Sequence, residues 1–278
     1  MGTVLIRRTS KEELLWARSL PSRRRFNSSN DYIYHVAMLE LLPSTYYGVQ
    51  ASLSTNAPTA MRNQFTASSI SLANGLYDHE DIIQAGWMVS TPLFGNLVPR
   101  VFIHWMVDGG RTGCYNFQCS GFVQISRSIA PGSHTQPVCI YGGDQFDLLF
   151  QIHKDVNNTG WWLTIEDQVI GYWPLALFKT LNEAASSAQW GGEIFSPRTA
   201  PGPQMGSGQF PEEGYQRAAF QRLTCVVDES KAWAAPNIYN VMDSSDKNDC
   251  YRVVEGPWGD DNPWLNSFYF GGPGGCEI

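Results

Sequence analysis

The sequence predicts an all-β fold, a sandwich or a barrel, and three observations lead to this prediction. Short segments with the alternating pattern of a strand follow one another along most of the chain. Sequences rich in glycine, asparagine and aspartate, which favour turns, separate these segments. The composition, with 13% aromatic residues, 26 glycines and 16 prolines in 278 residues, also favours strands and turns over helices.

The expected elements can be placed in order. A short helix with a capping box from Ser10 to Glu13 lies in an N-terminal segment, residues 1–25, which ends in a tribasic run. This segment is either a solvated surface helix or a remnant of an activation segment or linker, and residues 26–278 form the main domain. We expect one further helix, over 174–186, and a long irregular loop over 196–215. The expected strands are 32–39, 46–54, 64–74, 82–90, 100–108, 121–128, 146–155, 160–167, 168–174, 216–228 and 266–272.

Charge and motifs exclude several function classes. The net charge is −7 and the sequence pI is about 5.2, which argues against a nucleic-acid partner. No apolar run approaches the roughly 20 residues of a membrane helix, so we expect no membrane partner. The chain lacks a GxSxG elbow, an HExxH helix and a phosphate loop, and it implies no metal and no cofactor.

Cysteines and sequons suggest export. The six cysteines suit disulfides, although the sequence alone does not choose their pairing. Two N-glycosylation sequons begin at Asn27 and Asn157. No signal peptide is visible at the start, so the simplest expectation is an N-terminally truncated chain.

Two polar residues stand in apolar surroundings. Glu193 follows two glycines in AQWGGEIFS and precedes two apolar residues, which would partly desolvate its carboxyl. Gln84 lies in the strand-like stretch EDIIQAGWMVS. A surface acid and a hydrogen-bonded core amide are the ordinary interpretations of these two residues. Likewise, DHED (78–81) is expected to be a solvated turn and His104 a packed residue.

At these two stretches the sequence resembles the neprosin family of plant proteins. The similarity covers nearly all of residues 32–276. The matching motifs, in the family's order, are YYG (46–48), AGWMV (85–89), TGCYNFQCSGFVQ (112–124), YGGDQFD (141–147), WWL (161–163), GYWP (171–174), WGGE (190–193), QMGSGQFPEEG (204–214) and YFGGPGG (269–275).

The resemblance implies an antiparallel β-sandwich of two sheets and a glutamic peptidase that cuts after proline in acid. It places one catalytic glutamate at Glu193 and the other at position 84, where this chain has Gln84. An amide cannot titrate, but it can orient water and donate to an oxyanion, as in the Glu–Gln pair of fungal glutamic peptidases. Gln84 is therefore half of a working pair, the mark of a silent relative, or an engineered replacement.

Further residues complete the predicted site. Gly86 would leave space for a substrate backbone, and aromatic residues would accept proline, although each aromatic residue also fits ordinary core packing. Spacing and the resemblance suggest the disulfides Cys114–Cys119 and Cys250–Cys276, and Cys139 and Cys225 could form a third. The predicted pocket consists of Gly86, Trp87, Trp105, Tyr115 and Trp190.

We therefore expect a secreted or vacuolar acid endopeptidase, acting as a monomer on proline-containing peptides or proteins. Glu193 would be the general base and Gln84 its partner. The alternative is a catalytically silent extracellular or cell-wall module that binds proline-rich chains or glycans.

Overall fold

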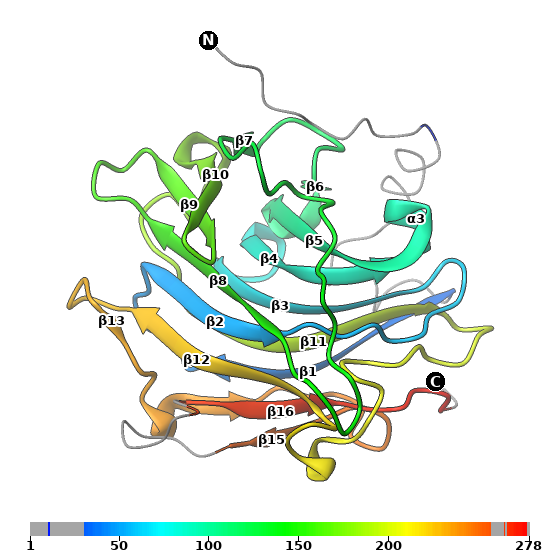
Figure 1. Cartoon of the computed structure of the whole chain (residues 1–278). Coiled ribbons are helices and arrows are strands. Elements are labelled where there is room, and N and C mark those ends of the chain that lie inside the picture. The colour runs from blue at the N-terminus through cyan, green and yellow to red at the C-terminus, as the bar shows by residue number, and fades with distance from the viewer. Residues whose placement is uncertain (1–10, 12–30, 257–263, 265, 277–278) are drawn as a thin grey trace.

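Two antiparallel sheets lie face to face and confirm the all-β sandwich (Figure 1). The computed structural model describes residues 11, 31–256, 264 and 266–276. Apart from Lys11, the predicted segment 1–25 lies outside these residues, as does Asn27 of the first sequon. Asn157 of the second sequon is exposed, in the turn between two neighbouring strands.

The first sheet has seven strands and carries the candidate site. All of its pairings are antiparallel. In spatial order its strands are β14 (Val241–Asp243), β1 (Tyr32–Leu41), β11 (Ser187–Pro197), β3 (Phe65–Asn74), β4 (Asp81–Ser90), β5 (Asn96–Val107) and β6 (Thr112–Tyr115).

The second sheet has nine strands and covers one face of the first. One of them, β13 (Trp233–Ala234), pairs with β12 beside the main path. The other strands, in spatial order, are β15 (Arg252–Glu255), β16 (Phe268–Gly271), β12 (Ala219–Val227), β2 (Gly48–Ser54), β8 (Asp147–Lys154), β9 (Gly160–Ile165), β10 (Gln168–Pro174) and β7 (Val123–Gln124).

The main core lies between the two sheets. Strand β4 sends Ile83, Ala85, Trp87 and Val89 into it, because alternate residues of a strand point to the same face. Trp87 is fully buried, and its indole N–H donates to the carbonyl oxygen of Ser54 at 2.8 Å. Burying each large apolar side chain contributes about 1.5–3 kcal/mol, so this layer is the main source of stability.

Helical segments are short in the described part of the chain. Helix α3 (Thr91–Phe94) follows β4, with the Ser90 hydroxyl accepting from the Leu93 amide at 3.3 Å as its N-cap. Among the described residues no helix is long and apolar enough to cross a bilayer. The remaining segments are single 3₁₀ turns at Tyr77–His79, Asp108–Gly110, Leu175–Leu177, Pro211–Glu213 and Ile238–Asn240.

The predicted helix over 174–186 is wrong, because two side chains of the first sheet bind the backbone that a helix would use. The carboxylate of Asp81 accepts from the amides of residues 179, 180 and 181, at 2.7, 2.7 and 3.3 Å. The amide of Asn74 donates to the carbonyl oxygens of Thr180 and Ala184, at 2.8 Å each. Only the 3₁₀ turn Leu175–Leu177 forms.

The strand predictions differ from the structure in two respects. The expected strand over 121–128 is reduced to Val123–Gln124. The segment 196–215 is irregular, as expected, apart from the end of β11 and one 3₁₀ turn. Sequence analysis missed β11, which lies between β1 and β3 and carries Glu193. The missed shorter strands are β6, β13, β14 and β15.

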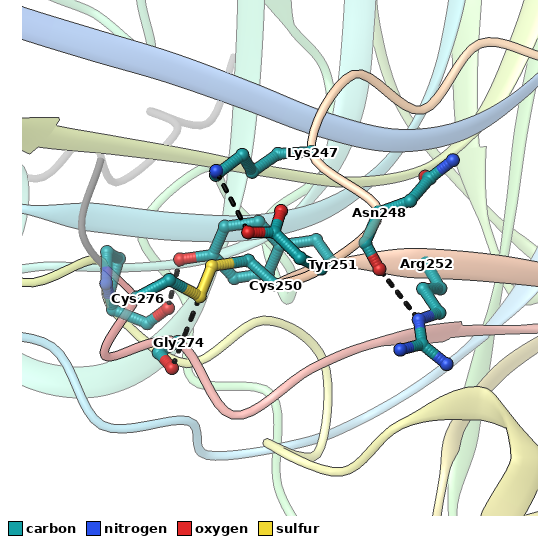
Figure 2. The surroundings of a disulfide bond; sticks show 9 residues. Lys247, Asn248, Cys250, Tyr251, Arg252, Gly274 and Cys276 are labelled. Carbon is teal, nitrogen blue, oxygen red and sulfur yellow. Dashed lines mark hydrogen bonds and ion pairs between the residues drawn. A yellow bond between two sulfur atoms is a disulfide. The ribbon is translucent and has the colours of Figure 1, made fainter.

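Two disulfides form as predicted, Cys114–Cys119 and Cys250–Cys276. Figure 2 shows the second, which joins the chain just before β15 to the chain after β16. Beside it, the Tyr251 hydroxyl donates to the carbonyl oxygen of Pro203 at 2.8 Å. The third predicted disulfide is absent, since Cys139 and Cys225 are free thiols.

Candidate active site

Gln84 and Glu193 lie on the face of the first sheet that points away from the main core. Their neighbours on either side in the chain, such as Ala85 and Ile194, belong to that core, so the alternation of each strand directs the two polar side chains outward. Gln84 and Glu193 are each 2% exposed. The strand-end surface location considered for Glu193 is therefore wrong.

The register of the sheet brings the two residues together diagonally. Glu193 is opposite Ala67 and Gln84 is opposite Ser71, so one cross-strand row separates them. In that row Ser69 of β3 stands between Gly191 of β11 and Gly86 of β4. Because the two glycines have no side chains, Gln84 and Glu193 can meet above Ser69.

Gly86 does not have the role that the sequence predicts. A Cβ atom at this position would lie 2.0 Å from the carbonyl oxygen of Ser68, so the backbone of β3 already fills the space. At Gly191, with φ of +144°, a Cβ atom would lie 2.3 Å from the carbonyl oxygen of Ala37. Both positions require glycine for close approach of strands rather than for a substrate backbone.

The Gln84 amide holds the Glu193 carboxyl directly. Its Nε2 donates to Glu193 Oε1 at 2.8 Å and to Ser69 Oγ at 2.7 Å. Ser69 thereby fixes the orientation of the amide. Gln84 is thus a hydrogen-bonded buried amide, as its ordinary interpretation expects, and its partner is Glu193, the glutamate predicted to be catalytic.

Tyr34 of β1 is the second donor to Glu193. Its hydroxyl donates to Oε2, the oxygen that Gln84 does not bind. Each carboxyl oxygen of Glu193 therefore has its own donor, one from β1 and one from β4. Such charge-assisted hydrogen bonds offset part of the cost of burying a carboxylate.

Three of the predicted pocket residues lie elsewhere. Trp87, Trp105 and Trp190 are at most 4% exposed and belong to the core between the sheets, on the opposite face of the first sheet. The indole N–H of Trp190 donates to the carbonyl oxygen of Gln50 at 2.8 Å, which fixes it there. Trp87 and Trp190 are three residues from Gln84 and Glu193, respectively, an odd number, so strand alternation directs them to the other face. Trp105 follows His104, which is aligned with Gln84, so it also points to the other face.

Tyr115 does lie on the face of Gln84 and Glu193. Its ring stacks on His104 with centroids 4.2 Å apart, and His104 is the cross-strand neighbour of Gln84. The expectation that His104 is a packed residue is confirmed by this contact. Tyr115 belongs to an outer-face aromatic cluster, which consists of Tyr32, Tyr34, Phe65, Ala67, Met88, Leu93, Phe94, Phe102, Tyr115 and Phe195.

An open groove begins on the side of Gln84 and Glu193 that is opposite to the outer-face aromatic cluster. It has a volume of about 260 Å³. Tyr34 and Val36 line its edge next to Glu193, since Tyr34 binds that carboxyl and Val36 is its cross-strand neighbour. We call this the β1 groove; it is lined by Tyr34, Val36, Met38, Glu40, Ala73, Glu80, Ile82, Gln189, Ser244 and Asp246.

Sequence reasoning missed Tyr34 and Ser69. The pattern YIYHVAML does place Tyr32 and Tyr34 on one face of β1. What it does not show is that this face is the one that carries Glu193, because β11 was not recognised as the neighbouring strand. Ser69 carries no signal of its own within SSISLAN.

The stretch DHED (78–81) is only partly the solvated turn that was expected. Asp78 and His79 are exposed in the 3₁₀ turn Tyr77–His79. Asp81, however, is fully buried, and its carboxylate accepts hydrogen bonds from four backbone amides. Among the described residues no group of three or more His, Cys, Asp or Glu is arranged to hold a metal ion.

Comparison with known proteins gives one family match. The Neprosin family model matches residues 62–273. A crystal structure of scytalido-glutamic peptidase with a transition state analog inhibitor is 10% identical, with a TM-score of 0.46, and the match covers 86% of this chain and 98% of that one. A structure of SCP-B, an Eqolisin family peptidase in complex with the tripeptide Ala-Ile-His, is 10% identical at a TM-score of 0.36, covering 87% and 98%. At these TM-scores neither structure assigns a function to this chain.

Proposed function

This chain belongs to the neprosin family, and we propose that it is a secreted acid endopeptidase of the glutamic type that cleaves on the C-terminal side of proline. Family membership supports a peptidase. The observation that carries the catalytic assignment is the contact of Gln84 Nε2 with Glu193 Oε1 at 2.8 Å, on the outer face of the sheet.

In this proposal Glu193 is the general base. Its carboxylate removes a proton from water as the water attacks the scissile carbonyl, and the resulting acid returns that proton to the leaving amine. Positioned proton transfer of this kind contributes roughly 10²–10⁴-fold to a rate. Tyr34 holds the second oxygen of Glu193 and so fixes the direction in which the base points.

Gln84 is the electrophilic partner. Its amide has no acidic proton to give, but an N–H can turn from Glu193 to the oxyanion that forms on the carbonyl carbon. One such donor is worth about 3–4 kcal/mol, or roughly 10²–10³ in rate. Ser69, 2.7 Å from Nε2, would keep the amide oriented while that exchange takes place.

The preference for proline is supported by the outer-face aromatic cluster. Phe195, two residues after Glu193 on the same face of β11, stacks between Tyr32 and Phe65 at centroid distances of 4.9 and 5.5 Å. Aromatic faces pack well against the flat, rigid ring of proline. A proline beside Glu193 would place its own carbonyl over the pair.

Secretion is supported by the two disulfides, which persist in oxidising compartments, and by the exposed sequon at Asn157.

The test is cleavage of a proline-containing peptide library, read by mass spectrometry across acid and neutral pH. The full chain and a form lacking residues 1–25 are assayed in parallel. Glu193→Gln is expected to abolish cleavage after proline, because an amide cannot accept the proton of water. Glu229→Gln, the same change at an exposed residue, is expected to have no effect.

The variant Gln84→Glu distinguishes the interpretations of position 84. Two carboxyls this close cannot both ionise, so the second must stay protonated to donate to the oxyanion. On the alkaline side of the pH–rate profile, the activity of the variant is therefore expected to fall at a lower pH than the activity of the unaltered chain. If only this variant cleaves, the scaffold is a peptidase silenced at Gln84. If folded forms of all variants fail to cleave but bind proline-rich peptide or polysaccharide saturably, the protein is a binding module.

A further inference from the structure

The β1 groove is continuous with the proposed catalytic pair. Along β3, Ala67 belongs to the outer-face aromatic cluster, Ser69 contacts Gln84, and Ala73 lines the groove. Along β11 the same order is Phe195, Glu193 and Gln189. The groove and the aromatic cluster therefore lie on opposite sides of the pair along the strands.

An endopeptidase must hold chain on both sides of the bond that it cuts. The aromatic cluster is the side proposed above to hold proline, whose carbonyl is the scissile one. Residues that follow the scissile bond must then extend in the other direction, where the β1 groove opens next to Tyr34 and Val36. The groove therefore marks a place for a substrate side chain even before its charge is considered.

The lining of the groove determines what this side chain would be. Val36, Met38, Ala73 and Ile82 form an apolar surface, which suits a long aliphatic stem. Three carboxylates also line the groove, Glu40, Glu80 and Asp246, whereas none of its described lining residues is basic.

Contacts with neighbouring groups orient two of the carboxylates. The Ser187 hydroxyl donates to Glu40 Oε1 at 2.8 Å. The Val36 amide donates to Asp246 Oδ1 at 2.9 Å, and His35 Nδ1 lies 3.1 Å from Asp246 Oδ2. Glu40 and Glu80 carry longer side chains than Asp246, and they are the carboxylates that the experiment alters.

We propose that the β1 groove is a subsite for a lysine or arginine side chain located within a few residues on the C-terminal side of the scissile bond. The aliphatic stem would lie on Val36, Met38 and Ile82, and the cationic end would lie near Glu40 and Glu80. This inference rests on the proposed endopeptidase function and names the substrate that the same site prefers.

The experiment compares peptides that share one proline and differ only at the positions that follow it. Each of the three following positions carries lysine, norleucine or glutamate in turn, so that the aliphatic stem is kept while the charge is removed or reversed. Cleavage is measured at about pH 5, where aqueous carboxylates are ionised. The chains are the unaltered protein, Glu40→Gln, Glu80→Gln, the double variant and the exposed control Glu229→Gln.

We expect kcat/KM to be highest for lysine at one of these positions. One solvent-screened ion pair gives up to about fivefold over norleucine, and glutamate is expected to be the poorest substrate. The double variant should lose the preference for lysine while it cleaves the norleucine peptide normally, and added salt should weaken the preference in the unaltered chain.

Equal cleavage of the lysine, norleucine and glutamate peptides at every position by the unaltered chain would overturn the subsite and leave the peptidase assignment intact. A lysine preference that survives in the double variant would overturn it as well. Absence of cleavage of every peptide by every chain would instead contradict the proposed function, which separates the two failures.

Discussion

At the scale of single residues, Glu193 is held by two donors that come from different strands. Tyr34 and Gln84 each bind one of its oxygens, so removing one donor leaves the hydrogen bond to the other oxygen in place. Gln84 also donates to Ser69, which fixes the orientation of its amide. The consequence is that Tyr34 can be altered without removing the proposed oxyanion donor.

Tyr34→Phe is expected to lower kcat on one proline peptide by roughly 10- to 100-fold. The lost hydroxyl held one oxygen of Glu193, so the variant no longer fixes the direction in which the proposed base points. A hydrogen bond to a charged group is worth about 1.5–3 kcal/mol, which sets this range. Steady-state kinetics on that peptide measure the change.

Tyr32→Phe is the matched control for this variant. Tyr32 lies two residues earlier on the same face of β1, and its ring stacks on Phe195. Removing its hydroxyl leaves that ring contact in place, so kcat should change little. If both variants lower kcat equally, the effect comes from β1 as a whole and Tyr34 has no specific role in positioning Glu193.

The contact between Gln84 and Glu193 could be anticipated from the sequence, whereas the surroundings of this proposed catalytic pair could not. A glutamate after two glycines and a glutamine among apolar neighbours are unusual enough to select Gln84 and Glu193, and the resemblance joined them. Trp87, Trp105 and Trp190 looked equally suitable for a pocket because composition does not reveal which face a side chain takes. The face is decided by whether a residue lies an odd or an even number of positions from the residue that the sheet aligns with Gln84 or Glu193.

At the scale of elements, two errors have related physical causes. Strand β11 was missed because two glycines and a charged residue interrupt its pattern, and such residues are normally depleted in strands. Pairing with β1 and β3 on both sides nevertheless imposes the extended conformation. Residues 174–186 have a helical pattern, but Asp81 and Asn74 take the backbone groups of residues 179–184 that a helix would need.

Asp81→Asn is expected to destabilise the protein by about 2–3 kcal/mol, because a carboxylate that accepts from four amides is replaced by a group that presents its own N–H to some of them. Asp81 is fully buried, so water cannot compensate. Urea unfolding followed by fluorescence measures the change.

The control for Asp81 is Asp155→Asn. Asp155 accepts from the amides of residues 157, 159 and 160, but it does so in a turn open to solvent. Its loss is expected to cost about 1 kcal/mol or less. Equal losses at both sites would show that burial of Asp81 is not what makes its amide contacts important.

At the scale of the whole molecule, the sandwich separates stability from chemistry. The core lies between the sheets, while the proposed pair, the aromatic cluster and the β1 groove share the outer face of the first sheet. Alternation and turn signals predicted an all-β sandwich or barrel, since both depend on local sequence, and the family resemblance implied the two sheets. The order of strands in each sheet depends on pairings between distant segments, such as β1 with β11, and local pattern does not encode these.

The two disulfides constrain the molecule to different extents, and their removal gives a prediction about the whole fold. Cys250–Cys276 spans 26 residues and Cys114–Cys119 spans five. In the chain-entropy account, the longer loop restricts the unfolded chain more, and the expected contributions are about 3.5 and about 2 kcal/mol. The double variant Cys250→Ala with Cys276→Ala should therefore lose more stability than Cys114→Ala with Cys119→Ala.

The measurement is urea unfolding of both double variants without reductant. The free thiols Cys139 and Cys225 should not exchange with the remaining disulfide in the native state, because burial raises the pKa of both and keeps them protonated. Proteolysis should locate the effect, with earlier cutting around β15 and β16 in the first variant only. Equal losses of stability, or a larger loss for the short loop, would show that local contacts around each sulfur pair outweigh loop closure in this fold.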